Sequence, residues 1–192
     1  MTRRTARRED LAEAATDYVL EHGLVDLSLR PMAAALGTSD RMLLYHFEDK
    51  DDLVATLLRV SNDRSVAGIR ALAPSADVRA AVHALWATVT SPAQDRCQRL
   101  YVEAAALGLL GREPYASVVR EANGVWVQAL ADHLVSSGMA PGRAGRAVVL
   151  LDAAFMGFQL DLPLDTGTAA RDAVRRAVED LADAVAHIAE QA

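Results

Sequence analysis

The chain has few of the residues that covalent or metal chemistry requires. Among its 192 residues there is one cysteine, Cys97, so no internal disulfide can form, which suits a reducing cytoplasm. Cys97 itself can be interpreted as a redox sensor or as an inert thiol near a helix start. The three histidines after residue 80 lack metal-ligand spacing, and neither a glycine-rich phosphate loop nor a nucleophile elbow is present. We therefore expect no enzyme activity, no metal and no cofactor.

Long apolar runs and an excess of basic residues are absent too. No apolar run is long enough to span a bilayer, and the N-terminus lacks the apolar core of a signal peptide, so we expect a cytoplasmic protein. The net charge is −6, and residues 1–50 hold seven basic against nine acidic residues. Four of the basic residues, Arg3, Arg4, Arg7 and Arg8, precede the first expected helix. Such an arm can follow the phosphates of a nucleic acid or enter its minor groove, or it can be a disordered solubilising tail.

Helical periodicity runs through the whole chain. Hydrophobic residues make up 52% of it, alanine is abundant, and no segment alternates in the way that strands do. The sequence therefore predicts an all-α protein with a substantial core. The expected helices are 9–22, 29–36, 40–47, 49–69, 77–89, 100–110, 114–137, 144–160 and 168–189.

Residues 28–50 have the punctuation of a helix–turn–helix. A hydroxyl residue can cap the first short helix, and Gly37 can take the left-handed conformation that ends it. Ser39 then starts a second helix, with Leu43 and Phe47 one turn apart on its buried side. Two short helices joined by a glycine-bearing turn form the compact unit whose second helix can enter the major groove of DNA.

The residues of this segment also follow a known pattern. They are Ser28, Arg30, Met32-Ala33, Gly37, Ser39, Tyr45-His46-Phe47 and Lys50, preceded by Ala14, Val19, Gly23 and Leu24 in the first helix and its glycine stop. On these residues the first quarter of the chain resembles the N-terminal domain of the TetR family of transcriptional regulators. It departs from the pattern at two positions: Leu44 stands where the family commonly has Tyr, and Thr38 where it has an apolar residue.

The resemblance implies two functional parts. Residues 1–50 would bind DNA, with the arginine-rich arm 1–8, and residues 51–192 would bind an effector and dimerise. In the family the last two helices form the dimer interface; here 144–160 is apolar almost all round and 168–189 carries one apolar stripe. We expect a homodimer on these helices, whose recognition helices lie about one DNA turn (~34 Å) apart and bind a palindromic operator. The alternative is a monomer in which these helices form an internal core.

The candidates for contact with double-stranded DNA fall into two groups. Asp40, Arg41, Leu44 and Tyr45 share the outer face of the second helix. Arg41 can bind guanine as a fork, Leu44 can meet a thymine methyl, and Asp40 can accept from cytosine or orient Arg41. The family pattern adds Arg30 as a residue that can reach a base, and it implies phosphate contacts from Ser28, Thr38, Ser39, His46 and Lys50. For the serines the alternative is capping alone, and for Tyr45 and His46 it is a solvated helix flank.

Six residues from different helices could line an effector cavity: Trp86, Tyr101, Glu103, Trp126, Phe155 and Gln159. For each of them, plain core packing is the alternative. Glu103 and Asp152 are unusual because both lie in apolar stretches, where a carboxylate needs a partner or takes a raised pKa. The aromatic character of the set predicts a small, mostly apolar effector with one or two hydrogen-bonding or cationic groups.

Together these patterns predict a ligand-responsive DNA-binding transcriptional regulator, a repressor that its effector releases from DNA. Two other interpretations stay open: an all-α small-molecule-binding protein that does not read DNA, and an enzyme built on a helical bundle. The first is distinguished by DNA affinity that is absent or insensitive to salt, because phosphate contacts make true binding strongly salt-dependent.

Overall fold

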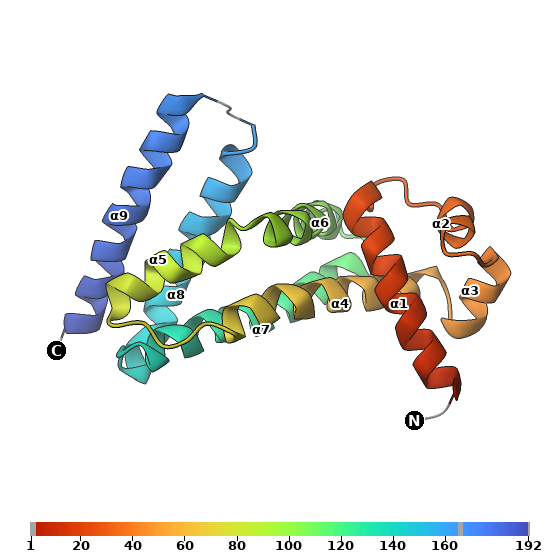
Figure 1. The fold of residues 1–192 in the computed structure, drawn as a ribbon, viewed down its shortest axis with the longest axis horizontal. Helices are drawn as coiled ribbons and strands as arrows, with labels where there is room; N and C mark the ends of the chain where they lie inside the picture. The colour runs from red at the N-terminus through yellow and green to blue at the C-terminus, as the bar shows by residue number, and fades with distance from the viewer. Residues whose placement is uncertain (1–2, 165–166, 192) are drawn as a thin grey trace. The chain divides into compact units, whose positions relative to one another are not determined.

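A computed structural model describes residues 3–164 and 167–191, and every regular element within these ranges is an α-helix (Figure 1). The elements are α1 (Arg3–His22), α2 (Leu29–Ala35), α3 (Asp40–His46), α4 (Lys50–Arg70), α5 (Val78–Val89), α6 (Pro92–Leu109), α7 (Tyr115–Ser136), α8 (Pro141–Asp161) and α9 (Thr168–Glu190). The predicted all-α class is confirmed.

Three helices begin earlier than the sequence pattern predicts. α1 begins at Arg3, because the residues before Glu9 are themselves good helix formers. α6 begins at Pro92 and α8 at Pro141, since proline fits the first turn of a helix, where its missing N–H has no helical partner.

Residue packing divides the chain into two compact units. The N-terminal unit runs to Ser65 and includes Asp95–Asn123, and the C-terminal unit comprises Val66–Gln94 and the chain from Gly124 onward. Three helices, α4, α6 and α7, therefore contribute residues to both units. The division at residue 50 into DNA-binding and effector-binding parts is a functional one and stays a prediction.

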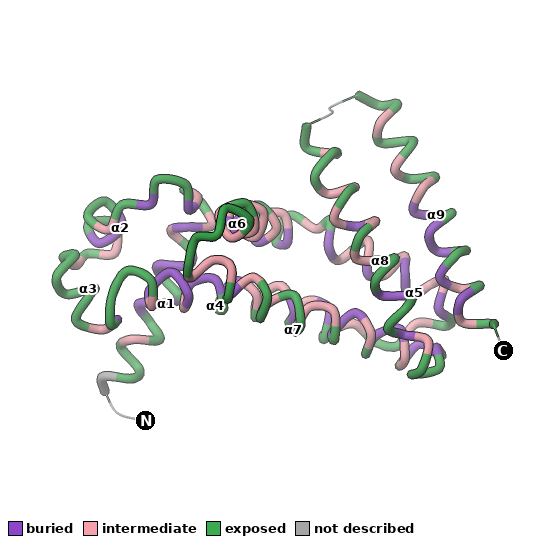
Figure 2. The backbone as a smooth tube through the Cα atoms, turned by 180° about the vertical axis from the view of Figure 1, so that it is seen from behind, coloured by how far each residue is buried: buried purple, intermediate pink, exposed green. Residues whose placement is uncertain are grey.

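The N-terminal unit has its own apolar core, seen as buried (purple) stretches on α1 and α4 in Figure 2. Its fully buried side chains include Val19, Met32, Leu43, Leu53, Leu57 and Leu100. Burying a side chain of this size contributes about 1.5–3 kcal/mol, so these residues fix how the short helices α2 and α3 lie against α1.

The C-terminal unit is built from α5, the second half of α7, α8 and α9. Its core includes Leu85, Leu130, Leu134, Leu151, Phe155 and Val185. The apolar stripe of α9 is part of this core, since Val178, Leu181, Val185 and Ile188 are all buried within a single subunit. The stripe that the sequence suggested for the dimer interface thus packs inside the subunit.

Within residues 3–164 and 167–191, no helix is both long and apolar enough to cross a membrane. The same residues contain no cluster of three or more His, Cys, Asp or Glu side chains arranged to hold a metal ion.

Candidate nucleic-acid interface

The turn between α2 and α3 is fixed by backbone geometry. Gly37 has φ +66°, the left-handed conformation predicted for it. Its N–H donates to the carbonyl of Ala34 at 3.1 Å, and the N–H of Thr38 donates to that of Ala33 at 2.9 Å. This pair of bonds is a Schellman ending, which satisfies carbonyls at the end of α2. The turn therefore sets the direction in which α3 leaves.

α3 has one buried side and one exposed side, as predicted. Leu43 and, just beyond the helix, Phe47 are buried. Asp40 and Arg41 are exposed, and Leu44 and Tyr45 are exposed by 36% and 61% of their surface. The four residues expected to face DNA bases therefore lie on the solvent side of α3, and Oδ1 of Asp40 accepts from the backbone N–H of Arg41 at 2.9 Å.

Met42 belongs to this exposed surface and was missed by the sequence reasoning. Its side chain is 49% exposed, although methionine at an apolar spacing is typical of a core. The signal was available, because Met42 directly precedes the buried Leu43 and cannot share its face of the helix.

The two cap serines differ in a way that the sequence does not reveal. The hydroxyl of Ser39 accepts a hydrogen bond from the N–H of Met42 at 3.2 Å and caps α3. Ser28 occupies the cap position of α2, but its side chain makes no capping bond, contrary to expectation. The Ser28 hydroxyl is exposed, whereas Thr38, the third hydroxyl candidate, is half-buried. Ser28 is therefore the hydroxyl most available to a phosphate.

Two other candidates for phosphate contacts, Lys50 and His46, contact neighbouring parts of the protein. Nζ of Lys50 donates to the carbonyl oxygen of Leu27 at 2.8 Å, so this ammonium ties the start of α4 to the loop before α2. It retains two further N–H donors. His46 is half-buried, its Nδ1 has no hydrogen-bond partner, and its ring lies edge-on to Tyr45 at 5.3 Å between centroids. Arg30 is exposed in the first turn of α2.

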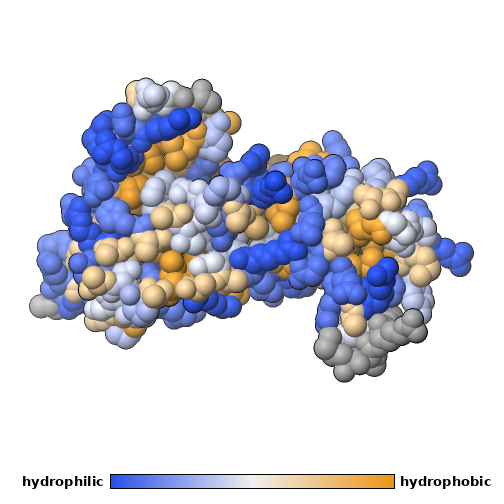
Figure 3. All heavy atoms as spheres, in the orientation of Figure 1, coloured by the Kyte–Doolittle hydropathy of each residue, from blue (hydrophilic) through white to orange (hydrophobic). Residues whose placement is uncertain are grey.

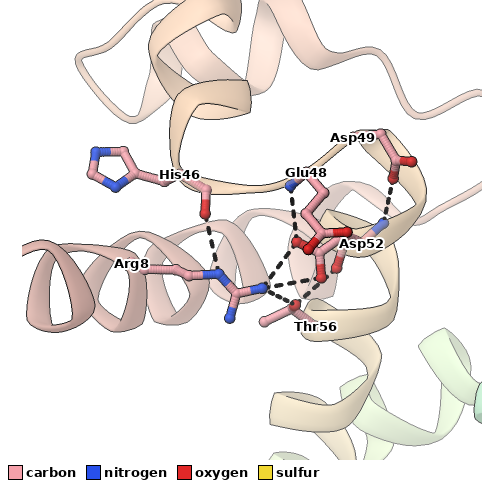
Figure 4. Close-up of polar contacts among 6 residues, drawn as sticks. All are labelled: Arg8, His46, Glu48, Asp49, Asp52 and Thr56. Atoms are coloured by element: carbon pink, nitrogen blue, oxygen red, sulfur yellow. Dashed lines mark hydrogen bonds and ion pairs between the residues drawn. The ribbon is translucent and has the colours of Figure 1, made fainter.

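Arg8 holds α1 to the α3–α4 connection (Figure 4). Its Nε donates to the carbonyl of His46 at 3.1 Å, and Nη2 donates to both carboxylate oxygens of Asp52 at 3.0 Å. The same nitrogen donates to the Thr56 hydroxyl at 3.2 Å, and the guanidinium lies 4.9 Å from the centroid of the Phe47 ring. These contacts fix the C-terminal end of α3.

The pKa of Asp52 reports on this arrangement. Partial burial alone would raise the pKa, but the N–H of Glu48, at 3.1 Å from Oδ2, stabilises the carboxylate. The Arg8 guanidinium and the charge of Arg59 act in the same direction, and the net pKa lies below its ordinary value. Asp52 is therefore a charged partner of Arg8 at neutral pH.

The expectation of a basic arm ahead of the first helix is wrong for residues 3–8. These residues are the first two turns of α1, and Met1 and Thr2 lie outside the described residues. Arg7 is exposed on the helix, and Arg8 is bound to Asp52. The arginine run is thus helical, and one of its members is structural.

Glu103 lies far along the chain but next to the loop after α1. Its Oε2 accepts from the backbone N–H of Leu24 at 2.5 Å and from that of Val25 at 3.0 Å. The partner that this carboxylate needs is therefore the backbone of the α1–α2 loop. A residue of α6 thereby holds the loop that leads from α1 into the helix–turn–helix.

The six effector candidates lie in different units. Tyr101 and Glu103 belong to the N-terminal unit, and the hydroxyl of Tyr101 donates to Oδ1 of Asn123 at 2.8 Å. The other four belong to the C-terminal unit: Trp86, Trp126, Phe155 and Gln159.

Within the C-terminal unit these side chains have identifiable partners. Trp86 packs against the buried Phe155, with centroids 5.1 Å apart. Nε1 of Trp126 donates to Oδ1 of Asp152 at 2.9 Å, and Nε2 of Gln159 donates to the carbonyl of Val89 at 2.9 Å. Burial raises the pKa of Asp152, and the Trp126 hydrogen bond partly opposes this rise. A direct role of these residues in effector binding stays a prediction.

Comparisons with known proteins bear on the fold. No protein-family model matches the sequence, and a comparison with curated proteins finds no match. Solved structures match nearly the whole chain. A transcriptional regulator from Rhodococcus sp. Rha1 is 24% identical with a TM-score of 0.74, covering 96% of this chain and 98% of its own. A Rhodococcus protein assigned to the TetR family is 19% identical with a TM-score of 0.74, covering 95% and 99%. The chain has the TetR-family fold.

A third protein with this TetR-family fold was solved with a ligand. It is assigned as a transcriptional regulator, comes from Saccharomonospora viridis and is in complex with choline; it is 19% identical with a TM-score of 0.69, covering 93% of this chain and 96% of its own. The first quarter of the sequence implied this fold by its resemblance to the TetR family, and the structural comparisons confirm the fold for the whole chain. In this TetR-type fold, α2 and α3 form the helix–turn–helix pair that the sequence predicted.

Proposed function

We propose that this protein is a ligand-responsive DNA-binding transcriptional regulator that works in the cytoplasm as a homodimer. One observation carries the proposal: a short, rigidly held α3 turns Asp40, Arg41, Leu44 and Tyr45 to solvent in a TetR-type fold. A helix held in this way can enter the major groove as a unit, without first paying for the ordering of its own backbone.

Sequence recognition is assigned to the exposed face of α3. The guanidinium of Arg41 can donate two hydrogen bonds to guanine, and Leu44 and Tyr45 supply apolar and aromatic contacts beside it. We assign phosphate contacts to Ser28, whose side chain makes no capping bond, and to Lys50, which keeps donors beside its bond to Leu27. Such contacts set the register on DNA, whereas Arg41 sets the sequence preference.

We assign the dimer interface to the outer face of α8 and the neighbouring face of α9. On α8 this face carries, beside Arg146, six small or apolar exposed residues: Gly142, Gly145, Val149, Ala153, Gly157 and Leu160. Val149 is 71% exposed within one subunit, although it lies in the middle of a 21-residue helix. On α9, Ala169, Ala173 and Ala184 continue the pattern of small exposed side chains. Small residues let helices of two subunits approach closely and form a four-helix interface.

The function that follows is repression released by an effector. A ligand that binds one conformation of the dimer more tightly shifts the population toward it, and release follows if that conformation holds the two α3 helices at a spacing that does not fit DNA. The neighbour in complex with choline supports an effector of small size. The helices α4, α6 and α7 run through both compact units, so they are the elements that can transmit such a change.

Selection of bound fragments from random or genomic DNA with the purified protein tests this function. We expect a palindromic consensus and an affinity that falls steeply with salt, because each phosphate contact releases counterions. Fragments without a common sequence, or an affinity that salt does not change, would overturn the proposal and favour a small-molecule-binding protein that does not read DNA.

A further inference from the structure

A groove of about 310 Å³ lies on the C-terminal unit, between α5 and the N-terminal half of α9. In Figure 3 it appears as recessed apolar surface beside α9, with hydrophilic side chains along its rim. Its volume is at the lower end of the range for small-molecule sites. Of the six residues that the sequence suggested for effector binding, only Trp86 lines this groove.

The body of the groove is apolar. Trp86 of α5 forms one wall, Val174 and Val178 of α9 form the opposite wall, and Leu162 closes the space beyond the end of α8. The ring of Phe158 packs edge-on against the indole of Trp86, with centroids 5.8 Å apart. An aromatic wall held in this way is preformed, so ordering it costs a ligand no binding free energy.

The acidic side chain that lines the groove has partners on α5. Near the start of α5, Glu179 is paired with Arg79 at 2.9 Å and lies 3.4 Å from Nε2 of His83. Arg79 also pairs with Asp183, so α5 and α9 run in opposite directions past each other. The later part of α5 therefore faces the first turns of α9. The Glu179 carboxylate is thus engaged by Arg79 of α5, one turn along α9 from Arg175.

Two guanidinium groups belong to the same groove. Arg171 and Arg175 lie one turn apart on α9 and both line the groove, opposite the hydroxyl-bearing Thr90. Arg175 is 3.6 Å from Asp172, but both side chains are largely exposed, so this pair contributes little. Among residues 3–164 and 167–191, no carboxylate forms an ion pair with Arg171. A planar guanidinium with free donors is suited to a carboxylate.

We infer that this groove binds a small amphipathic organic anion, with its carboxylate at Arg171 and Arg175 and its apolar body against Trp86. The apolar side chains and the two guanidinium groups line the same groove, and its carboxylate, Glu179, is already engaged by Arg79. The inference departs from the effector that the sequence predicted, which carried hydrogen-bonding or cationic groups. As an effector site it rests on the proposed function; as a binding site it does not.

Three probes of matched shape test the charge assignment: 3-phenylpropionate, 3-phenylpropionamide and 3-phenylpropylamine. The chain has two tryptophans, so its two indole N–H signals in an NMR spectrum can be assigned with Trp86→Phe. We expect 3-phenylpropionate to shift the Trp86 signal and to bind roughly tenfold more tightly than the amide, because charge-assisted hydrogen bonds are the stronger ones. Equal or tighter binding of the amide or the amine, or no shift of Trp86, would overturn the inference.

Substitutions of the guanidinium end separate a specific site from general charge attraction. Arg171→Gln should remove the preference for the carboxylate, whereas Arg70→Gln, at an exposed arginine of the same unit outside the groove, should leave it unchanged. Arg171→Glu should reverse the preference in favour of 3-phenylpropylamine, a gain that a misfolded variant could not show. Equal effects of Arg171→Gln and Arg70→Gln would show that the groove does not select the anion.

DNA binding is measured in parallel on the same samples. If 3-phenylpropionate binds at Trp86 with the expected dependence on Arg171 but the operator affinity does not change, the anion site stands and its role as an effector site fails. If no operator is found at all, the proposed function fails and the groove assignment is judged by the probes alone.

Discussion

Oε1 of Glu103 lies 2.9 Å from the point where a Cβ on Gly23 would stand. The same carboxylate accepts the N–H groups of Leu24 and Val25, so it occupies the space that a side chain at position 23 would need. Gly23 also has φ +83°, a conformation that residues with a Cβ rarely adopt. Two independent requirements thus meet at one glycine.

Gly23→Ala should therefore destabilise the protein more than Gly37→Ala. At Gly37 φ is +66°, but no atom lies within 4 Å of the added Cβ, so alanine there costs only the backbone strain of about 1–2 kcal/mol. At Gly23 the displacement of the Glu103 carboxylate adds to that strain. Urea denaturation of the two variants at one protein concentration measures the difference directly.

A double-mutant cycle isolates the carboxylate term. In a Glu103→Ala background the cost of Gly23→Ala should fall to that of Gly37→Ala, since the displaced carboxylate is gone. If Gly23→Ala cost the same in both backgrounds, the approach of Glu103 to this turn would carry no energy.

Arg41→Ala should weaken operator binding by about 1–3 kcal/mol and relax the preference at one operator position. Ser28→Ala is the matched control, because the Ser28 hydroxyl makes no capping bond and its loss should leave α2 stable. It should weaken all DNA sequences by the same factor. The measurement is a binding titration against operator and scrambled DNA; an equal loss on both for Arg41→Ala would show that Arg41 does not contact a base.

The fold was predictable from the sequence because its signals are local. Gly37 ends α2 and Ser39 caps α3 through residues three or four positions away, and burial of Leu43 and Phe47 follows from helical spacing. These features need no knowledge of the rest of the chain, so a single sequence is enough to recognise the helix–turn–helix.

The partners of charged residues were not predictable, because they lie far apart in sequence. Arg8 and Asp52 are 44 residues apart, and Glu103 is 79 residues from Leu24. No periodicity links such pairs. The sequence therefore suggested a free arm for the arginines of residues 3–8 and a place in an effector cavity for Glu103. The groove between α5 and α9 has the same origin, since only the antiparallel packing of these helices brings Trp86 to Arg171 and Arg175.

Val149→Asp should convert the proposed dimer to a folded monomer. Val149 is exposed in one subunit, so aspartate there costs little until a second subunit buries it without a partner. Phe155→Asp, on the opposite side of the same helix, should unfold the protein, because Phe155 is 2% exposed and lies in the core. Sedimentation and circular dichroism distinguish the two results. A Val149→Asp variant that still sediments as a dimer would place the interface elsewhere.

The Arg8–Asp52 contact should make part of the stability sensitive to acid. The pKa of Asp52 in the folded protein lies below its unfolded value of about 3.9, so its contribution is present above that value and is lost as the pH falls through the folded pKa. Asp52→Asn should therefore destabilise the protein at pH 7 and progressively less toward pH 3. Asp63→Asn, at an exposed residue of the same helix, should show no such trend in urea denaturation.

Asp152 should show the opposite pH dependence, because burial raises its pKa in the folded protein. Below the unfolded pKa the carboxyl is neutral in both states and costs nothing; as the pH rises through the folded pKa, ionisation of the buried group lowers the free energy of unfolding. Asp152→Asn keeps an oxygen that can accept from Nε1 of Trp126 and removes the charge. The variant should thus be more stable than the natural protein at pH 7 and equal to it near pH 3.

Trp126→Phe completes the test of Asp152. It removes the hydrogen bond that Nε1 of Trp126 donates to this carboxylate, so it should destabilise the protein at pH 7 more than at pH 3. Combined with Asp152→Asn, the same substitution should lose most of its pH dependence, since no buried charge is then left without its donor. Urea denaturation at both pH values, at one fixed protein concentration, measures all four proteins. A loss for Trp126→Phe that is the same at both pH values would show that the indole N–H does not stabilise the ionised form of Asp152.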